Sequence, residues 1–141
     1  MNLTEKQQEI IDEFSVYEDW MDKYEYIIDL GKDLPEIDEA LKTPERLIDG
    51  CQSKVWLVAE EKEGKVHYRA DSNTDITKGL ISLLIRVLNH RSPKEILEAN
   101  LDFIPRIGMG NILGSQRSNG LAAMMNQMKR YALAFQTKQN A

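Results

Sequence analysis

The sequence contains a single cysteine among its 141 residues, with only four prolines and two histidines. One cysteine cannot form an internal disulfide, which fits a reducing compartment, so we expect a cytoplasmic protein. It also excludes a zinc or iron–sulfur site built from several cysteines of one chain. No apolar run approaches the roughly 20 residues that a membrane-spanning helix needs. The first residues lack a basic stretch followed by an apolar one, so we expect no membrane segment and no secretory signal.

A basic stripe is lacking as well. The formal net charge is −5, and the acids are concentrated in the first 50 residues, which carry 15 acids and 5 bases. Residues 51–141 carry 8 acids and 13 bases. An acidic chain of this kind is a poor candidate for binding nucleic acid. With 42% hydrophobic and 29% charged residues, the composition predicts a single globular domain over residues 1–141.

The N-terminal third shows helical spacing of its apolar residues. A capping-box pattern at residues 4–7, with Thr4 as the N-cap, predicts a short first helix. Trp20 begins a stripe that recurs at three- and four-residue intervals, which predicts a second helix over 17–31 with Trp20 in the core. Gly31 is then expected to stop this helix. A further short helix is expected over residues 36–41.

The middle of the chain predicts a β-hairpin and a buried helix. Residues 54–61 and 66–70 are rich in β-forming side chains and flank a turn with a glycine. Residues 76–90 are apolar on nearly all sides, as in a helix at the centre of a domain. Helices are also expected from Ser92, as N-cap, and over 117–135, with broken structure over 100–116. The predicted fold class is α+β, a small antiparallel β-sheet packed against several helices.

The cysteine stands in a polar turn directly before the first predicted strand. Cys51 follows Gly50, which can adopt backbone conformations closed to other residues, and precedes Gln52 and Ser53. A lone cysteine is more often a small buried hydrophobe. Its polar neighbours favour a loop that presents the thiol to another molecule. Because a thiolate is the reactive form, Lys54 or Arg117 could favour it if either lies close in space.

Two familiar roles for a reactive cysteine lack their other parts. A cysteine protease needs a base near Cys51, and neither His67 nor His90 stands at a recognisable catalytic spacing. A thiol–disulfide oxidoreductase would normally bring a second, resolving cysteine. What remains is a thiol that receives a group and passes it on.

The cysteine loop, Gly50-Cys51-Gln52-Ser53 followed by Val55-Trp56, resembles the corresponding loop of the SufE family of cysteine-desulfuration proteins. Further matches fall in family order from about residue 18 to residue 130. They are Asp19-Trp20, Lys23-Tyr24, residues 26–31, Leu34-Pro35, Pro44, Asp71-Ser72, residues 78–81, Arg117-Ser118, Gly120-Leu121 and Ala123-Met124.

The resemblance implies a SufE/IscU-like fold and a role in sulfur transfer. It implies that Cys51 accepts a persulfide from a pyridoxal-phosphate-dependent cysteine desulfurase (SufS-like), stimulates that enzyme and hands sulfur to an iron–sulfur scaffold (SufBCD-like). The chain would be a sulfur carrier and desulfurase activator and not a stand-alone enzyme. It would hold no cofactor or metal of its own, since the pyridoxal cofactor belongs to the partner. A scaffold such as IscU needs several ligands, whereas a carrier needs one thiol.

Two alternatives remain open at this point. The chain could belong to the related CsdE branch, which serves a different desulfurase, or be a regulatory adaptor whose Cys51 is structural. Gly50, Gln52, Ser53, Lys54 and, more weakly, Arg117 are the expected partner-binding residues. The oligomeric state stays open, a homodimer included. We also expect Cys51 to be shielded against apolar side chains until a partner docks, with Gly50 as the hinge.

Overall fold

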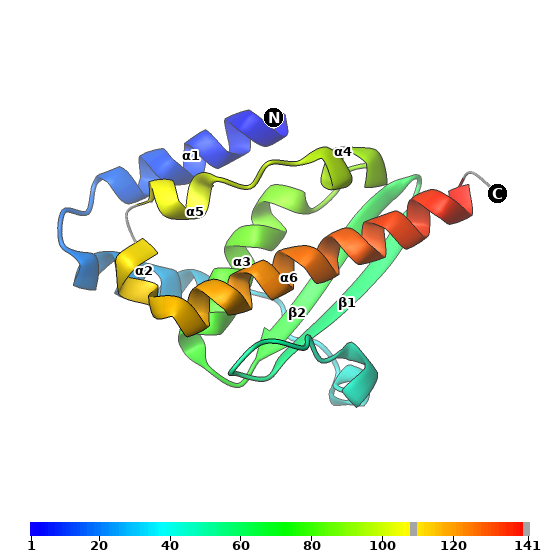
Figure 1. The fold of residues 1–141 in the computed structure, drawn as a ribbon, viewed down its shortest axis with the longest axis horizontal. Coiled ribbons are helices and arrows are strands. Elements are labelled where there is room, and N and C mark those ends of the chain that lie inside the picture. Colours follow the sequence, from blue (N-terminus) through cyan, green and yellow to red (C-terminus); the bar gives the residue numbers. More distant parts are fainter. Residues whose placement is uncertain (108–109, 140–141) are drawn as a thin grey trace.

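The computed structural model describes the backbone of residues 1–107 and 110–139, and the side chains of these residues except 110–118. Helices surround one β-hairpin, and α6 runs along it (Figure 1). The elements in chain order are α1 (Leu3–Ser15), α2 (Trp20–Lys32), the short 3₁₀ helices η1 (Glu39–Leu41) and η2 (Pro44–Arg46), β1 (Val55–Lys62), β2 (Lys65–Ser72), α3 (Asp75–Leu88), α4 (Pro93–Glu98), α5 (Phe103–Arg106) and α6 (Gly110–Gln139). The predicted α+β class is confirmed.

The hairpin is antiparallel, with Cα pairs running from Val55↔Ser72 at the open end to Lys62↔Lys65 at the turn. Glu63 and Gly64 both have positive φ angles, of 55° and 78°, as a two-residue turn of a twisted hairpin requires. The hairpin was predicted correctly, but the second strand extends to Ser72. Its last two residues, which lie beyond the predicted strand, therefore continue the ladder. One face of the sheet lies in the core through Val55, Leu57, Val66, Tyr68 and Ala70.

Helix α3 is the centre of the core, as its apolar sequence predicts, with ten of its residues buried. Helix α2 packs on it so closely that Gly31 of α2 meets the backbone of Gly79 in α3. The prediction that Gly31 stops the helix is wrong, because α2 continues to Lys32. This glycine is present because a side chain would not fit between the two helices.

The predicted burial of Trp20 is wrong. Trp20 is the first residue of α2, follows the N-cap Asp19, and is 49% exposed. The stripe does bury Ile27 and Gly31 further along the helix. At the start of α2 the same periodicity runs past the edge of the core, so spacing alone does not place Trp20 inside.

Other boundaries differ from expectation for local reasons. Asn2, not Thr4, caps α1, because the Asn2 side chain and Glu5 satisfy each other's backbone N–H groups. The helix expected over 36–41 is reduced to η1. Ser92 caps α4 as predicted.

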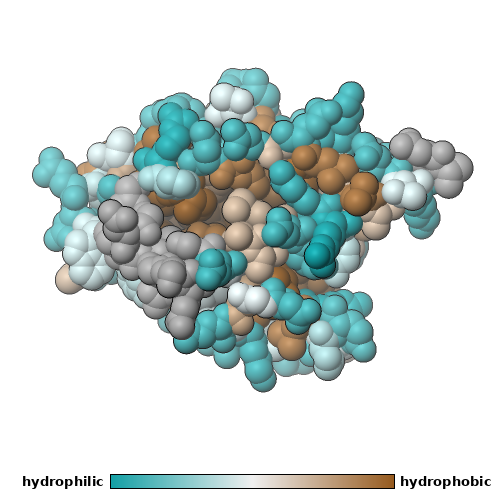
Figure 2. Space-filling model, viewed as in Figure 1, coloured by the Kyte–Doolittle hydropathy of each residue, from teal (hydrophilic) through white to brown (hydrophobic). Residues whose placement is uncertain are grey.

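Helix α6 is longer than expected, because it begins at Gly110 and takes in Gly114 and Gly120. Its packing against α3, α4 and α5 compensates for the low helix propensity of these glycines. On the face shown in Figure 2, apolar residues gather in a hollow between α6 and the α4–α5 segment. Part of the broken structure expected over 100–116, residues 108–109, lies outside the described residues. No helix within the described part of the chain is long and apolar enough to cross a membrane.

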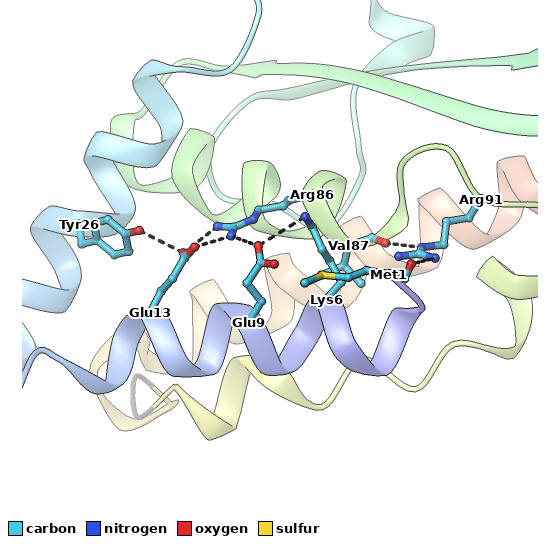
Figure 3. Close-up of polar contacts among 8 residues, drawn as sticks. All are labelled: Met1, Lys6, Glu9, Glu13, Tyr26, Arg86, Val87 and Arg91. Carbon is cyan, nitrogen blue, oxygen red and sulfur yellow. Dashed lines mark hydrogen bonds and ion pairs between the residues drawn. The ribbon is translucent and has the colours of Figure 1, made fainter.

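An ionic cluster joins α1, α2 and α3 (Figure 3). Arg86 of α3 donates to Glu13 at 2.7 Å and to Glu9 at 2.6 Å, both on α1. The Tyr26 hydroxyl of α2 donates to Glu13 at 3.1 Å. The hydrogen bond from Arg86 is the largest cause of a lowered pKa for both carboxyl groups, against the opposing effect of burial.

We expect this cluster to make the fold acid-sensitive. Because the folded-state pKa of Glu13 lies below its unfolded value, its stabilisation is present above the unfolded pKa and is lost as pH falls through the folded one. Arg86→Met should lower the free energy of unfolding at pH 7 by about 1 kcal/mol through the Glu13 pair. As pH falls through the range where Glu13 titrates, the free energy of unfolding should decrease less in this variant than in the wild type. Urea unfolding at several pH values measures this. An equal decrease in the free energy of unfolding with pH in the variant and the wild type would contradict this role of the cluster.

Candidate functional site

The cysteine loop, residues 49–54, is closed at its base by a short extension of the sheet. The backbone N–H of Ile48 donates to the carbonyl of Val55 at 2.9 Å, and Leu47 bridges to Trp56. This pairing holds the two ends of the loop together, so Cys51 lies at its tip. Gly50 has φ +91°, a left-handed conformation that strains any residue with a side chain. The turn predicted around Cys51 is therefore present and depends on Gly50.

The C-terminal half of the loop is anchored to the connection between β2 and α3. The Ser53 hydroxyl accepts hydrogen bonds from Thr74 at 3.0 Å and Thr77 at 3.2 Å. The Lys54 N–H donates to the Asn73 side chain at 2.9 Å, and the Asn73 N–H donates back to the Lys54 carbonyl at 3.2 Å. Ser53 is thus fixed through its side chain, and Lys54 is fixed through its backbone.

The N-terminal half is held less firmly. Among the described residues, neither Asp49 nor Gln52 uses its side chain in a hydrogen bond, and both are exposed. A Cβ atom on Gly50 would lie 3.3 Å from the Cβ of Ala123, so this half lies against α6. Fewer hydrogen bonds therefore hold the N-terminal half of the loop than the C-terminal half.

The thiol itself points at α6. Cys51 is half-buried, and its Sγ donates to the carbonyl of Gly120 at 3.6 Å. Burial raises the pKa of the thiol above its ordinary value. No charged group among the described side chains offsets that rise, so Lys54 does not favour the thiolate in this resting geometry. A raised pKa favours the protonated thiol, which is the less nucleophilic form.

A pocket of about 360 Å³ opens beside Cys51. Polar groups from the loop and from the start of α3 form one side, and apolar side chains from α3 and α6 form the other. Its lining comprises Cys51, Gln52, Ser53, Asn73, Thr74, Ile76, Thr77, Leu80, Gly120 and Met124. The partial burial of Cys51 expected from sequence is present, and the apolar side chains of Ile76, Leu80 and Met124 line the pocket beside it.

The histidines take no part in this site. His67 and His90 contact each other, with ring centroids 4.4 Å apart, where α3 ends. Cys51 lies instead beside the first turns of α3. Among the described residues, no three His, Cys, Asp or Glu side chains lie close enough together to hold a metal ion. The geometry offers one partly buried thiol beside a pocket with polar and apolar lining, and no general base among the described side chains lies next to it.

The structure sorts the predicted partner residues by role. Gly50, Gln52 and Lys54 are exposed at the loop. Ser53 is partly buried and uses its hydroxyl to anchor the loop. The Arg117 side chain lies outside the described residues.

Sequence reasoning missed the residues that hold the loop. These are Asn73, Thr74 and Thr77 on one side and Gly120 on the other. The polar residues between β2 and α3 carry the available signal for Asn73 and Thr74.

The chain matches known proteins over most of its length. Residues 8–132 match the family model of SufE, described as an Fe–S metabolism associated domain. A SufE-like protein of Rhizobium meliloti is 35% identical over 129 residues, which cover 88% of this chain and 92% of that protein. A SufE-like protein of Synechocystis is 36% identical over 131 residues, which cover 93% of this chain and 82% of that protein.

A chloroplastic/mitochondrial SufE-like protein of Arabidopsis thaliana is 38% identical over 137 residues, which cover 96% of this chain but 37% of the longer plant protein. The solution structure of a hypothetical protein from Thermus thermophilus has the same fold, with a TM-score of 0.73 at 19% identity, covering 92% of this chain and 96% of that chain. The chain belongs to the SufE family, with a role in sulfur transfer linked to iron–sulfur metabolism and to a cysteine desulfurase.

Proposed function

We propose that Cys51 accepts sulfane sulfur from a cysteine desulfurase and carries it as a persulfide. In this step the Cys51 thiolate attacks the outer sulfur of a persulfide on the desulfurase cysteine. A new S–S bond forms to Cys51, the old S–S bond breaks, and the donor cysteine leaves as a thiolate. The proton lost from Cys51 is available to that thiolate, and no external oxidant or reductant is needed.

The observation that carries this proposal is the placement of Cys51 in a loop whose C-terminal half is anchored by several hydrogen bonds, whereas the thiol makes a single hydrogen bond to Gly120 of α6. Ser53 and Lys54 fix the C-terminal half, while Gly50, with φ +91°, precedes the thiol and is the hinge that we propose. A loop of this kind can turn its tip outward and enter a narrow site on a partner. The raised pKa of Cys51 supports a resting state in which the thiol is protected.

We expect alkylation to report this switch. Iodoacetamide should label Cys51 of the free protein at least about tenfold more slowly than a cysteine in an unfolded peptide, because the thiol is shielded and protonated. Addition of a desulfurase whose own catalytic cysteine has been removed should speed the labelling. Mass spectrometry at timed intervals measures both rates. Labelling of the free protein at the peptide rate would show that Cys51 is permanently exposed.

Incubation with a desulfurase and free cysteine tests the proposal directly. Mass spectrometry of the intact chain should show the gain of one sulfur atom on Cys51, which dithiothreitol removes. Stimulation of the desulfurase without this gain would favour the regulatory adaptor. Preference for a different desulfurase over a SufS-like enzyme would place the chain in the CsdE-like branch.

The partner surface centres on the exposed part of the loop. We propose that Gly50, Gln52 and Lys54 contact the desulfurase, that Ser53 supports them through its anchor, and that Arg117 adds a contact from α6. Lys54→Glu should slow association about tenfold at low salt, with a smaller effect at high salt, because a rim charge acts mainly through the association rate. Surface plasmon resonance at two salt concentrations measures this. Normal binding and sulfur acceptance by Arg117→Ala would show that this arginine is structural.

We propose that this chain works as a single cytoplasmic domain. The sulfur then passes from Cys51 to an iron–sulfur scaffold of the SufBCD type. Transfer to the scaffold reverses the chemistry at Cys51: a scaffold thiolate attacks the outer sulfur and Cys51 leaves as a thiolate. The protein without its partners can be a monomer or a homodimer. Sedimentation at several protein concentrations distinguishes the two.

A further inference from the structure

Three large apolar side chains lie exposed at the corner between α1 and α2. Val16 is 73% exposed, Trp20 49% and Met21 52%, and these three residues, which are near one another in the chain, are here called the corner patch. The indole of Trp20 meets the ring of Tyr24 edge-on, with centroids 6.5 Å apart, which fixes one side of it. Aromatic and methionine side chains are enriched among the residues that dominate protein–protein binding energy and adapt to a partner's surface. Such a group on a soluble domain indicates a binding surface.

Acidic side chains border this patch. Residues 12–29 contain seven acids and a single base, Lys23. Glu18, Asp22 and Glu25 are exposed, and within the described part of the chain none of them forms an ion pair. An apolar centre with an acidic border is complementary to a protein surface that has an apolar depression bordered by lysine and arginine. It would repel nucleic acid and anionic lipid.

The corner patch lies away from the cysteine pocket. Helix α2 touches α3 through Ile27 and Gly31 at Gly79, close to the pocket-lining Leu80. Trp20 lies eleven residues before Gly31, about 16 Å away along the helix axis. In Figure 1 the α1–α2 connection is at the left edge, whereas the cysteine loop is below the middle. A partner that takes the cysteine loop into its active site can therefore leave the corner patch uncovered.

We propose that the corner patch is the docking surface for the protein that receives sulfur from Cys51, a scaffold protein with an apolar, basic-bordered depression. The proposal rests on the carrier function. Donor and recipient both need the same thiol, so they cannot occupy the cysteine loop together. A recipient held at a second surface is already in place when the donor leaves, so the persulfide is exposed to water only briefly. Held there, the recipient has a high effective concentration near Cys51.

Binding of the purified scaffold by calorimetry tests this proposal without any sulfur chemistry. Met21→Ser and Trp20→Ser should each weaken scaffold binding about tenfold or more, as expected at a binding hot spot. Glu25→Lys should also weaken it and reduce the dependence on salt. The matched control is Leu133→Ser on α6, since Leu133 is also 52% exposed, and it should change binding by no more than about twofold. Sulfur loading of Cys51 by the desulfurase should be unchanged in all four variants.

Three results would overturn the proposal. The first is scaffold binding that is undetectable in the wild type or unchanged in both apolar variants. The second is loss of desulfurase loading with scaffold binding intact, which would assign the patch to the donor. The third is loss of self-association alone, which would assign it to a second copy of this chain. Failure of the carrier function is a separate result, because it would appear as no sulfur on Cys51 of the wild type while scaffold binding could still be measured.

Discussion

Replacing Cys51 with serine should abolish sulfur acceptance while leaving the fold intact. A serine hydroxyl is nearly isosteric with the thiol, and the hydrogen bonds that anchor the loop at Ser53 and Lys54 do not involve Cys51, so the loop geometry is retained. The hydroxyl cannot form a persulfide, and an unactivated hydroxyl is a poor nucleophile. Sulfur on the chain after incubation with a desulfurase and cysteine should fall about a hundredfold or more, to the background of the mass spectrum. Unfolding in urea should show little change from the wild type.

The same variant separates the carrier from the adaptor. If stimulation of desulfurase turnover requires removal of sulfur from the donor cysteine, Cys51→Ser should lose that stimulation together with sulfur acceptance. Retained stimulation in a variant that accepts no sulfur would instead mean that binding alone activates the desulfurase. Ser53→Ala is a useful companion, because it keeps the thiol and removes only the anchor to Thr74 and Thr77. It should still accept sulfur and should be alkylated faster than the wild type.

Local patterns predicted the parts of the fold that local physics determines. The hairpin followed from two β-rich runs around a glycine turn, and α3 followed from a sequence that is apolar on nearly all sides. Ser92 followed by proline predicted the start of α4. In each case the residues that determine the element lie within a few positions of one another, so the sequence contains the whole signal.

The errors came where distant contacts decide the outcome. Gly31 has the properties of a helix stop, yet it lies within α2 because Gly79, 48 residues away, approaches its backbone. Trp20 fits a buried stripe, yet the core does not extend beneath it. Cys51 and its turn could be located from sequence, whereas Asn73, Thr74, Thr77 and Gly120 could not be placed beside it without the fold. Spacing along a chain does not report which elements pack together.

Gly79→Ala should be severely destabilising, because α2 and α3 touch there without any side chain between them. A Cβ atom on Gly79 would overlap the carbonyl oxygen and side chain of Ile27, and one on Gly31 would lie 2.6 Å from the Gly79 nitrogen. Backbone atoms cannot move aside as a flexible side chain can, so the helices must separate and the core beneath them must loosen. We expect Gly79→Ala to lower the free energy of unfolding by about 3 kcal/mol or more, and Gly31→Ala by a similar amount. Urea unfolding followed by circular dichroism measures both.

Gly120→Ala provides the matched control for this prediction, since it makes the same substitution inside another helix. Its Cβ would lie 3.8 Å from the Cys51 Sγ, an ordinary contact, and alanine is about 1 kcal/mol more favourable than glycine within a helix. We therefore expect Gly120→Ala to be neutral or slightly stabilising in the same measurement. The added methyl group should also shield the thiol and slow its alkylation. If Gly120→Ala lowered the free energy of unfolding as much as Gly79→Ala, the explanation would be wrong. The loss in Gly79→Ala would then not come from the close approach of α2 and α3, but from replacing a helical glycine in general.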